Sequence, residues 1–295
     1  MVNIIDLKFQ GFSKAIASFL IESGDGPILI ETGPHSTLKT LMKSVNNLGY
    51  QMEDIRHVLL SHIHFDHAGA AWALAKQGAK IYLHPLGAKH MADPSRLYES
   101  AKRIYKDKMD SLWGRLEPIK KDHLFQIPDK ETLKIGGLTL VAHHTPGHAI
   151  HHIAWQLEDM LFTGDIAGVR MMDGPVVPPC PPPDIDLEAW ISSISLIRNM
   201  NLSKLYLTHF GAFDDIGDHL DRLMERLNNW SDWIKERWSK GMSHDEITPR
   251  FRQYVEEQLI EFGLNESELG RYEAANPAWM SVAGLMRYWD RKTNQ

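Results

Sequence analysis

The chain has 295 residues, of which 43% are apolar and 24% are charged, as in ordinary globular proteins. Its 32 basic and 38 acidic side chains give a net charge of −6. This balance argues against a dedicated nucleic-acid-binding protein, because such proteins carry strongly basic surfaces. The single cysteine, Cys180, excludes an internal disulfide and a zinc site built from several thiolates, whereas 16 histidines offer many imidazole ligands.

The sequence shows neither the pattern of a secretory leader nor a run of about 18 apolar residues. We therefore expect a soluble, cytoplasmic protein with no membrane contact. Its expected partner is a small-molecule substrate, with no nucleic acid involved.

The first part of the chain alternates between short strands and helices. Strands are predicted for four apolar runs, at 17–22, 27–31, 56–60 and 80–83. Apolar residues at helical spacing predict a helix over 38–48, ended by Gly49, and an alanine-rich helix over 67–77, ended by Gly78. This alternation indicates a mixed α/β body.

Residues 94–116 show the periodicity of an amphipathic helical insertion. It carries Tyr98, Tyr105 and Trp113. We interpret these aromatic residues as packing groups, and a lid over a functional site is the alternative.

The strand pattern then returns, at 133–144, 152–157, 160–163 and 204–208. A proline-rich loop at 175–184 leads into a helix over 187–197. Cys180 lies in this loop, and no neighbouring residue in the sequence would lower the pKa of its thiol, so we expect it to be unreactive.

The last part of the chain is predicted to be helical. One long helix ends at Gly241, a capping box at 243–246 begins the next, and Asn276-Pro277 begins the last. We divide the chain into a body at 1–212 and a helical C-terminal region at 213–295. Its tryptophans are expected to pack on the body, while a homodimer surface or a wall of the substrate site remains an alternative.

The most informative segment is Ser61-His62-Ile63-His64-Phe65-Asp66-His67, between a predicted strand and a predicted helix. In extended backbone, residues two apart point to the same side, so His62 and His64 can bind one ion together. Asp66 and His67 follow at the turn, where they can face a neighbouring ion. Four ligand-type side chains exceed what one tetrahedral ion needs from a single segment, so the spacing indicates two metals.

Three further candidate ligands each come just after a predicted strand: His148, Asp165 and His209. One ion would bind His62, His64 and His148, and the other Asp66, His67 and His209. Asp165 can bridge the two ions, because a carboxylate has two oxygens. A position left for a shared water would make this a catalytic site.

With these motifs the sequence resembles the metallo-β-lactamase superfamily, and within it the glyoxalase-II-like hydrolases. The resemblance covers the His-x-His-x-Asp-His segment, Thr-Pro-Gly-His at 145–148, Phe-Thr-Gly-Asp at 162–165 and Thr-His-Phe-Gly at 208–211. It implies an αββα sandwich of two mixed sheets flanked by helices, with a helical C-terminal extension, and the same ligand assignment. His152 would support the metal ligands without binding metal.

Two positions depart from the family pattern. Glu31 stands where aspartate commonly precedes Thr-Gly. The contact that this side chain makes behind the metal ligands is therefore expected to differ. Asp165 occupies a position where zinc β-lactamases usually have cysteine, which argues against antibiotic hydrolysis.

The expected activity is metal-assisted hydrolysis of a thioester, carboxylic ester or lactone by a hydroxide that bridges two divalent metals. Zinc is the expected metal, with iron or manganese as alternatives. Asp66 would orient the nucleophile or receive its proton. Two other activities stay open. One is an iron-dependent persulfide dioxygenase using His62, His148 and Asp165, and the other is a two-metal phosphodiesterase.

Overall fold

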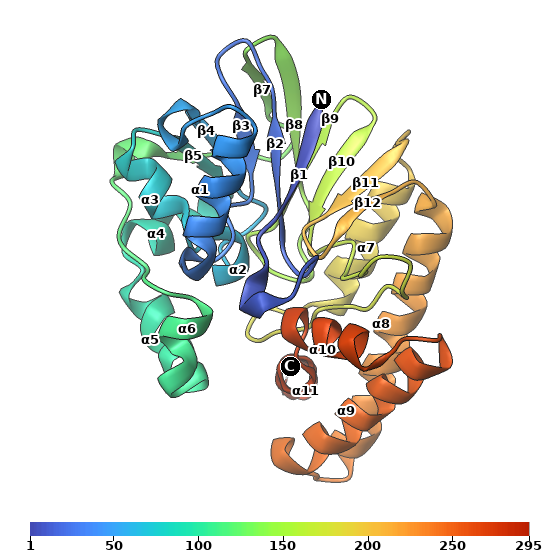
Figure 1. The fold of residues 1–295 in the computed structure, drawn as a ribbon. Helices are drawn as coiled ribbons and strands as arrows, with labels where there is room; N and C mark the ends of the chain where they lie inside the picture. Colours follow the sequence, from blue (N-terminus) through green and yellow to red (C-terminus); the bar gives the residue numbers. More distant parts are fainter. Residues whose placement is uncertain (295) are drawn as a thin grey trace.

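The computed structural model describes residues 1–294, in which two six-stranded sheets pack face to face (Figure 1). The first sheet has the order β1-β2-β3-β4-β5-β6. Its strands are β1 Val2–Asp6, β2 Ala17–Ile21, β3 Ile28–Ile30, β4 His57–Leu59, β5 Lys80–Leu83 and β6 Leu124–Gln126. The pairs from β3 to β6 are parallel, and the two pairs from β1 to β3 are antiparallel.

The second sheet has the order β12-β11-β10-β9-β8-β7. Its strands are β7 Thr132–Ile135, β8 Leu138–His144, β9 Ile153–Leu157, β10 Met160–Gly164, β11 Lys204–Leu207 and β12 Gly211–Phe213. Only the β10–β11 pair is parallel, so this sheet is mixed as well.

The inner faces of the two sheets share an apolar core rich in aromatic side chains. Phe19 of the first sheet meets Phe162 of the second edge to face, with ring centroids 5.2 Å apart. Phe162 in turn stacks on Tyr206 at 4.8 Å. Such pairs stabilise a core beyond the area they bury. They therefore hold the sheets, and the strand ends that carry the candidate ligands, in a defined relative position.

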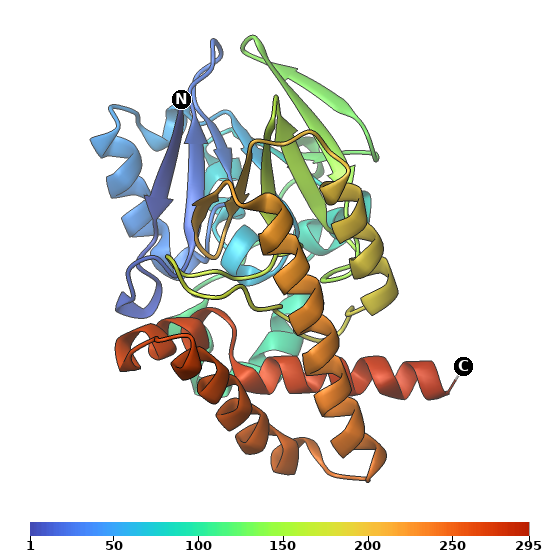
Figure 2. The ribbon, with the colours of Figure 1, turned by 90° about the vertical axis from the view of Figure 1, so that its right-hand side faces the viewer.

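Helices cover both outer faces, which completes the predicted αββα sandwich (Figures 1 and 2). The first sheet is covered by α1 Leu38–Asn47, α3 Ala71–Lys76 and α4 Pro85–Ala92. The second is covered by α7 Leu187–Arg198 and α8 Ile216–Ser239. The fold class and the C-terminal helices are as the sequence predicts. No helix within residues 1–294 combines the length and the apolar character needed to cross a bilayer.

Two helical segments from distant parts of the sequence lie at one end of the sandwich (Figures 1 and 2). One is the insertion, with α5 Ser95–Tyr105, a 3-10 turn at Lys106–Lys108 and α6 Met109–Leu112. The other contains α9 His244–Glu261, α10 Glu266–Ala275 and α11 Ala278–Thr293. A pocket lined by residues of both segments lies between them.

The helix expected over 67–77 is wrong as a continuous element. The structure has α2 Phe65–Ala68 and then α3, with a break at Gly69 and Ala70. The backbone breaks because the Ala70 amide donates to the Gly33 carbonyl, and the His67 carbonyl accepts from Thr32. These bonds to the loop after β3 replace helical ones, and they hold the segment that carries the candidate ligands against the sheet.

Other expected boundaries also need correction. The strand expected over 133–144 is a hairpin of β7 and β8, because Gly136 and Gly137 both take positive φ angles in a tight turn. The insertion is not one helix, since Lys106 interrupts it with a positive φ. Residues 204–208 are not the last strand, because β12 follows. The strands β1 and β6 and the helices α4 and α10 were also not predicted.

Candidate metal centre

All seven predicted ligands come together at one end of the sandwich. The segment after β4 carries His62, His64, Asp66 and His67, with the last two in α2. The other three follow strands of the second sheet: His148 lies between β8 and β9, Asp165 follows β10 directly, and His209 lies just beyond β11. Side chains at strand ends are held by a rigid backbone. Both sheets therefore contribute ligands to the same point.

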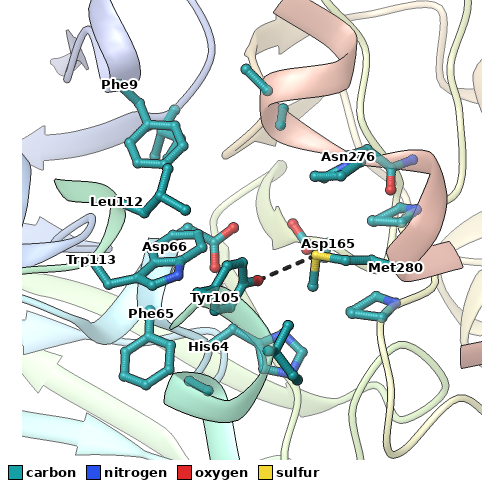
Figure 3. Close-up of a pocket in the computed structure, with 18 of the residues that line it drawn as sticks. Phe9, His64, Phe65, Asp66, Tyr105, Leu112, Trp113, Asp165, Asn276 and Met280 are labelled. Carbon is teal, nitrogen blue, oxygen red and sulfur yellow. Dashed lines mark hydrogen bonds between the residues drawn. The ribbon is translucent and has the colours of Figure 1, made fainter. Parts of the chain in front are cut away.

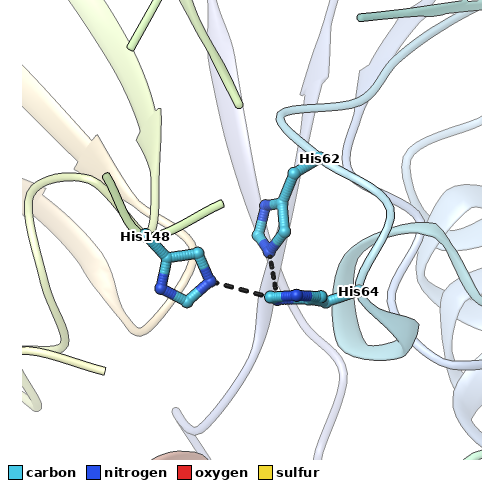
Figure 4. A group of neighbouring side chains, drawn as sticks. All are labelled: His62, His64 and His148. Carbon is cyan, nitrogen blue, oxygen red and sulfur yellow. Dashed lines mark hydrogen bonds between the residues drawn. The ribbon is translucent and has the colours of Figure 1, made fainter. Parts of the chain in front are cut away.

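The first ligand group consists of His62, His64 and His148, whose ring nitrogens converge (Figure 4). His64 Nδ1 lies 2.8 Å from His62 Nε2 and 3.0 Å from His148 Nε2. Zinc–nitrogen bonds of 2.0–2.1 Å in tetrahedral geometry would place two such nitrogens about 3.3 Å apart. The three imidazoles are thus arranged to share one ion after a small outward adjustment.

The second group consists of Asp66, His67 and His209. Asp66 Oδ2 lies 3.3 Å from His209 Nε2 and 3.6 Å from His67 Nε2. Both rings are buried, whereas the Asp66 side chain is 18% exposed. Asp66 is therefore the most exposed member of this group.

Asp165 lies between the two groups and presents a different oxygen to each. Its Oδ2 is 3.3 Å from His148 Nε2, and its Oδ1 is 3.3 Å from His67 Nε2 and 3.5 Å from His209 Nε2. This placement matches the geometry of a carboxylate that bridges two cations.

Hydrogen bonds on the far side of the rings fix which nitrogen faces the site. His148 Nδ1 lies 2.8 Å from the Pro179 carbonyl, and His209 Nδ1 lies 2.8 Å from the Ala15 carbonyl. Because a carbonyl only accepts, each Nδ1 carries a proton, and each Nε2 faces the site. This is how orienting contacts prepare imidazoles for metal binding.

Glu31, the departure from the family pattern, is buried directly behind His67. Its Oε1 lies 3.5 Å from His67 Nδ1 and accepts a hydrogen bond of 3.2 Å from the Ser61 amide. The glutamate therefore orients a ligand ring and, through Ser61, the start of the ligand segment.

His152 and Gly147 shape the loop that carries His148. His152 Nε2 accepts from the Asp165 amide at 3.2 Å, so it supports a ligand from behind rather than facing the site. Gly147 has a φ of +140°, and a Cβ there would lie 2.3 Å from Trp190 Cα. Only glycine allows this loop to pass so close to α7.

The site is rich in negative charge, which favours the binding of cations. Three carboxylates (Glu31, Asp66 and Asp165) lie around His67, and no lysine or arginine within residues 1–294 forms an ion pair with them. Burial alone would lower the pKa of His67, but Asp165, Asp66 and Glu31 raise it well above its usual range. Burial would raise the pKa of Asp66, but His67 and His209 lower it to about 2.

Three buried atoms in the site also lack a hydrogen-bond partner among the described residues: His67 Nε2, His209 Nε2 and Asp165 Oδ1. A buried polar atom without a hydrogen-bond partner destabilises the folded protein. A group of such atoms that face one place therefore indicates that a bound group interacts with them there. Imidazoles and carboxylates together suit divalent ions such as zinc, iron or manganese. The residues therefore fit a pair of metal ions.

A deep pocket leads from the surface to these ligands (Figure 3). It encloses about 1030 Å³, including its solvent-open part, and His64, Asp66, His148, Asp165 and His209 form its inner end. Phe9, Leu97, Leu112 and Trp113 line one wall, and residues 274–277 and Met280 line the other. A small molecule can reach both ligand groups through this pocket.

The pocket changes the interpretation of the aromatic insertion. Tyr105 and Trp113 line the pocket, so they do more than pack, whereas Tyr98 is absent from its lining. The C-terminal region likewise supplies a wall, although Trp230 and Trp289 are buried against the body as expected. Cys180 is fully buried, which raises the pKa of its thiol and agrees with an unreactive residue.

Sequence reasoning missed Phe9, Gln10 and the junction between α10 and α11 as parts of the pocket. Phe9 and Gln10 carry no recognisable motif. Asn276-Pro277 was noted only as a helix start, and no local signal shows that it faces the ligands. For α10 a signal existed: Asn265 and Glu268 form a capping box.

The chain belongs to the metallo-beta-lactamase superfamily, whose pattern matches residues 14–209. It is 28% identical over 187 residues to the metallo-beta-lactamase fold-containing protein ST1585 of Sulfurisphaera tokodaii. The aligned region covers 59% of this chain and 69% of that protein. It is 26% identical over 206 residues to the atrochrysone carboxyl ACP thioesterase of Aspergillus fumigatus, covering 69% of this chain and 39% of that one.

Among solved structures, the metallo-beta-lactamase family protein TTHA1429 of Thermus thermophilus superposes with a TM-score of 0.69 at 18% identity, over 99% of this chain and 94% of that one. This likeness shows that the fold extends over the C-terminal helices. The fungal thioesterase is matched over less than half its length.

Proposed function

We propose that the protein is a hydrolase with two divalent metal ions, expected to be zinc, that cleaves an ester-type bond in a thioester, carboxylic ester or lactone. One observation carries this proposal. Two ligand groups, His62/His64/His148 and Asp66/His67/His209, face opposite oxygens of Asp165 at the inner end of a pocket.

When bound, a metal pair supplies an activated water and a Lewis acid for the substrate oxygen. The chain's own contribution begins with Asp66. Since its pKa is lowered to about 2, it is a carboxylate at every working pH and a weak base. It is therefore suited to accept a hydrogen bond from the attacking water and to orient it.

Tyr105 supplies a neutral donor among the residues that line the pocket. Burial and the nearby Asp66 carboxylate raise the pKa of its hydroxyl, so it stays protonated. It can donate to a substrate oxygen on which negative charge develops, as oxyanion-binding groups do. The curated relative named as an ACP thioesterase supports a thioester among the candidate bonds.

The test combines metal analysis with a substrate panel. Purified protein should contain about two metal ions per chain. It should hydrolyse at least one member of a panel of thioesters, carboxylic esters, lactones, phosphodiesters and β-lactams. His62→Ala and His209→Ala should each lose one ion and at least about 100-fold in kcat/KM. His244→Ala, a change at a partly exposed histidine of α9 outside both ligand groups, is the matched control.

Full activity in a verified metal-free protein would overturn the proposal. About one iron per chain with oxygen uptake on persulfides would support the dioxygenase instead. The complete second group of Asp66, His67 and His209 favours the two-metal hydrolase over a one-iron enzyme.

A further inference from the structure

One wall of the pocket is made largely of aromatic side chains. The aromatic wall is built around Trp113, which stacks on Phe9 at 5.4 Å and on Phe65 at 5.9 Å between ring centroids. Tyr105 meets Trp113 edge to face at 5.2 Å. Aromatic rings locked together in this way give a rigid apolar surface.

The opposite wall is also apolar. It is formed by Pro179, Pro181 and Pro182 of the proline-rich loop and by Ala274, Pro277 and Met280 near the C-terminus. Its polar side chain, Asn276, is already engaged, since Nδ2 donates to the Pro178 carbonyl and Oδ1 accepts from Ser281. Little hydrogen-bonding capacity is left on this side for a polar ligand.

Within residues 1–294, no lysine or arginine lines the pocket, and its charged residues are the two candidate ligands Asp66 and Asp165. Trp113 Nε1 is buried and has no partner among the described residues. A neutral N–H can satisfy a carbonyl or ether oxygen, but it cannot neutralise a carboxylate or phosphate. An anion seated between these walls would therefore lose its hydration without gaining a countercharge.

We propose that the pocket binds an uncharged, bulky apolar acyl group, aromatic or long-chain, with the bond to be cleaved at the metal end. This inference rests on the proposed function and narrows it. It separates the protein from hydrolases of acyl groups that carry a terminal carboxylate, because that carboxylate would lie between the apolar walls.

The test uses acyl thioesters of one small, uncharged thiol, so that only the acyl group varies. Each methylene that becomes buried is expected to improve kcat/KM about fourfold, so octanoyl should exceed acetyl by at least about 100-fold. Butanoyl and succinyl differ in whether the chain ends in a methyl or in a carboxylate. Butanoyl should exceed succinyl by at least about 100-fold.

Two variants connect this preference to the pocket. Ala274 lines the pocket without belonging to the apolar core, so Ala274→Trp should fill the cavity and abolish the octanoyl advantage. Ile104 is 42% exposed and lines the pocket, so Ile104→Arg should reduce the butanoyl-to-succinyl ratio at least about tenfold. Ile260 is an exposed apolar residue of α9, so Ile260→Arg is the matched control. It should leave the butanoyl-to-succinyl ratio unchanged.

Binding separates this inference from the proposed function. Nonan-2-one, an uncleavable ketone, should bind the metal-loaded protein in calorimetry, and Ala274→Trp should weaken it at least about tenfold. Ketone binding without hydrolysis of any ester would support the apolar pocket and overturn the hydrolase. Hydrolysis of acetyl, succinyl and octanoyl thioesters at similar kcat/KM would overturn the pocket's preference and leave the hydrolase standing.

Discussion

The hydroxyl of Tyr105 lies 3.3 Å from the sulfur of Met280, although 175 residues separate them in the sequence. Tyr105 ends α5 of the insertion, and Met280 belongs to the first turn of α11. Tyr105 also meets Trp279 edge to face at 5.8 Å. This contact joins the two walls of the pocket (Figure 3). Both segments are therefore needed to define the space that a substrate occupies.

Tyr105→Phe should lower kcat about 10- to 100-fold with little change in KM, because the lost hydroxyl would donate mainly to an oxygen that becomes charged in the transition state. Metal content should stay at the wild-type level, since Tyr105 does not contact the ring nitrogens. Steady-state kinetics and elemental analysis check both statements.

Tyr98→Phe is the matched control for this change. Tyr98 lies on the same helix, its hydroxyl is 3.5 Å from Asp110, and it does not line the pocket. Equal losses in the two variants would show that the effect comes from a disturbed insertion rather than from a donor in the site.

Glu31→Gln should weaken binding at the second ligand group by about 10- to 100-fold, because the variant keeps the shape but removes the negative charge behind His67. Titration with a chelator, followed by metal analysis, should show the variant releasing one ion well before the other. Glu22→Gln, at an exposed glutamate beyond β2, should behave like the wild type. Unchanged metal retention in Glu31→Gln would contradict the orienting role.

The candidate ligands could be predicted from sequence because each sits in a short local pattern at a strand end. His62 and His64 are two residues apart, and Asp165 and His209 come directly after or just beyond apolar strands. The strands hold the backbone in place, and the backbone holds the candidate ligands. A short pattern in the sequence is therefore enough to predict that these side chains come together. The strand pattern indicated a mixed α/β body, and the two-sheet sandwich followed from the family resemblance.

The pocket could not be predicted in this way, because its walls depend on contacts between distant segments. Whether Tyr105 packs or lines a cavity depends on Met280 and Trp279, which lie in a helix at the other end of the chain. The break after Ala68 has a similar cause, since Gly33 accepts from the Ala70 amide. The spacing of apolar residues shows which face of a helix can be buried. Contacts with distant segments determine which side chains are buried and which line a cavity.

Gly164→Ala should destabilise the protein by about 2 kcal/mol or more and reduce its metal content. Gly164 has a φ of +50°, and a Cβ there would lie 2.5 Å from Ser61 Cβ and 2.7 Å from His152 Nε2. The strain would fall on the residue just before Asp165. Urea unfolding and metal analysis measure the two effects.

Gly217→Ala is the opposite case and serves as the control. Gly217 lies in the first turn of α8, and an added Cβ meets nothing within 4 Å. Alanine should therefore stabilise the protein by about 0.5–1 kcal/mol with unchanged metal content. Wild-type stability and metal content in Gly164→Ala would contradict the proposed crowding behind Asp165.

His219, which is not a candidate ligand, should make the stability of the protein depend on pH. Burial is the main cause that lowers its pKa to about 4, from 6.5, and its Nε2 lies 2.8 Å from the Ala167 carbonyl. Between these two pH values the unfolded chain binds a proton that the folded chain does not, so the free energy of unfolding falls as the pH drops from about 6.5 to about 4. The contribution of this one group is at most about 3 kcal/mol. In urea unfolding at pH 7 and pH 4, His219→Gln should lose less stability than the wild type. An equal loss in the two proteins would show that His219 does not contribute to the acid sensitivity.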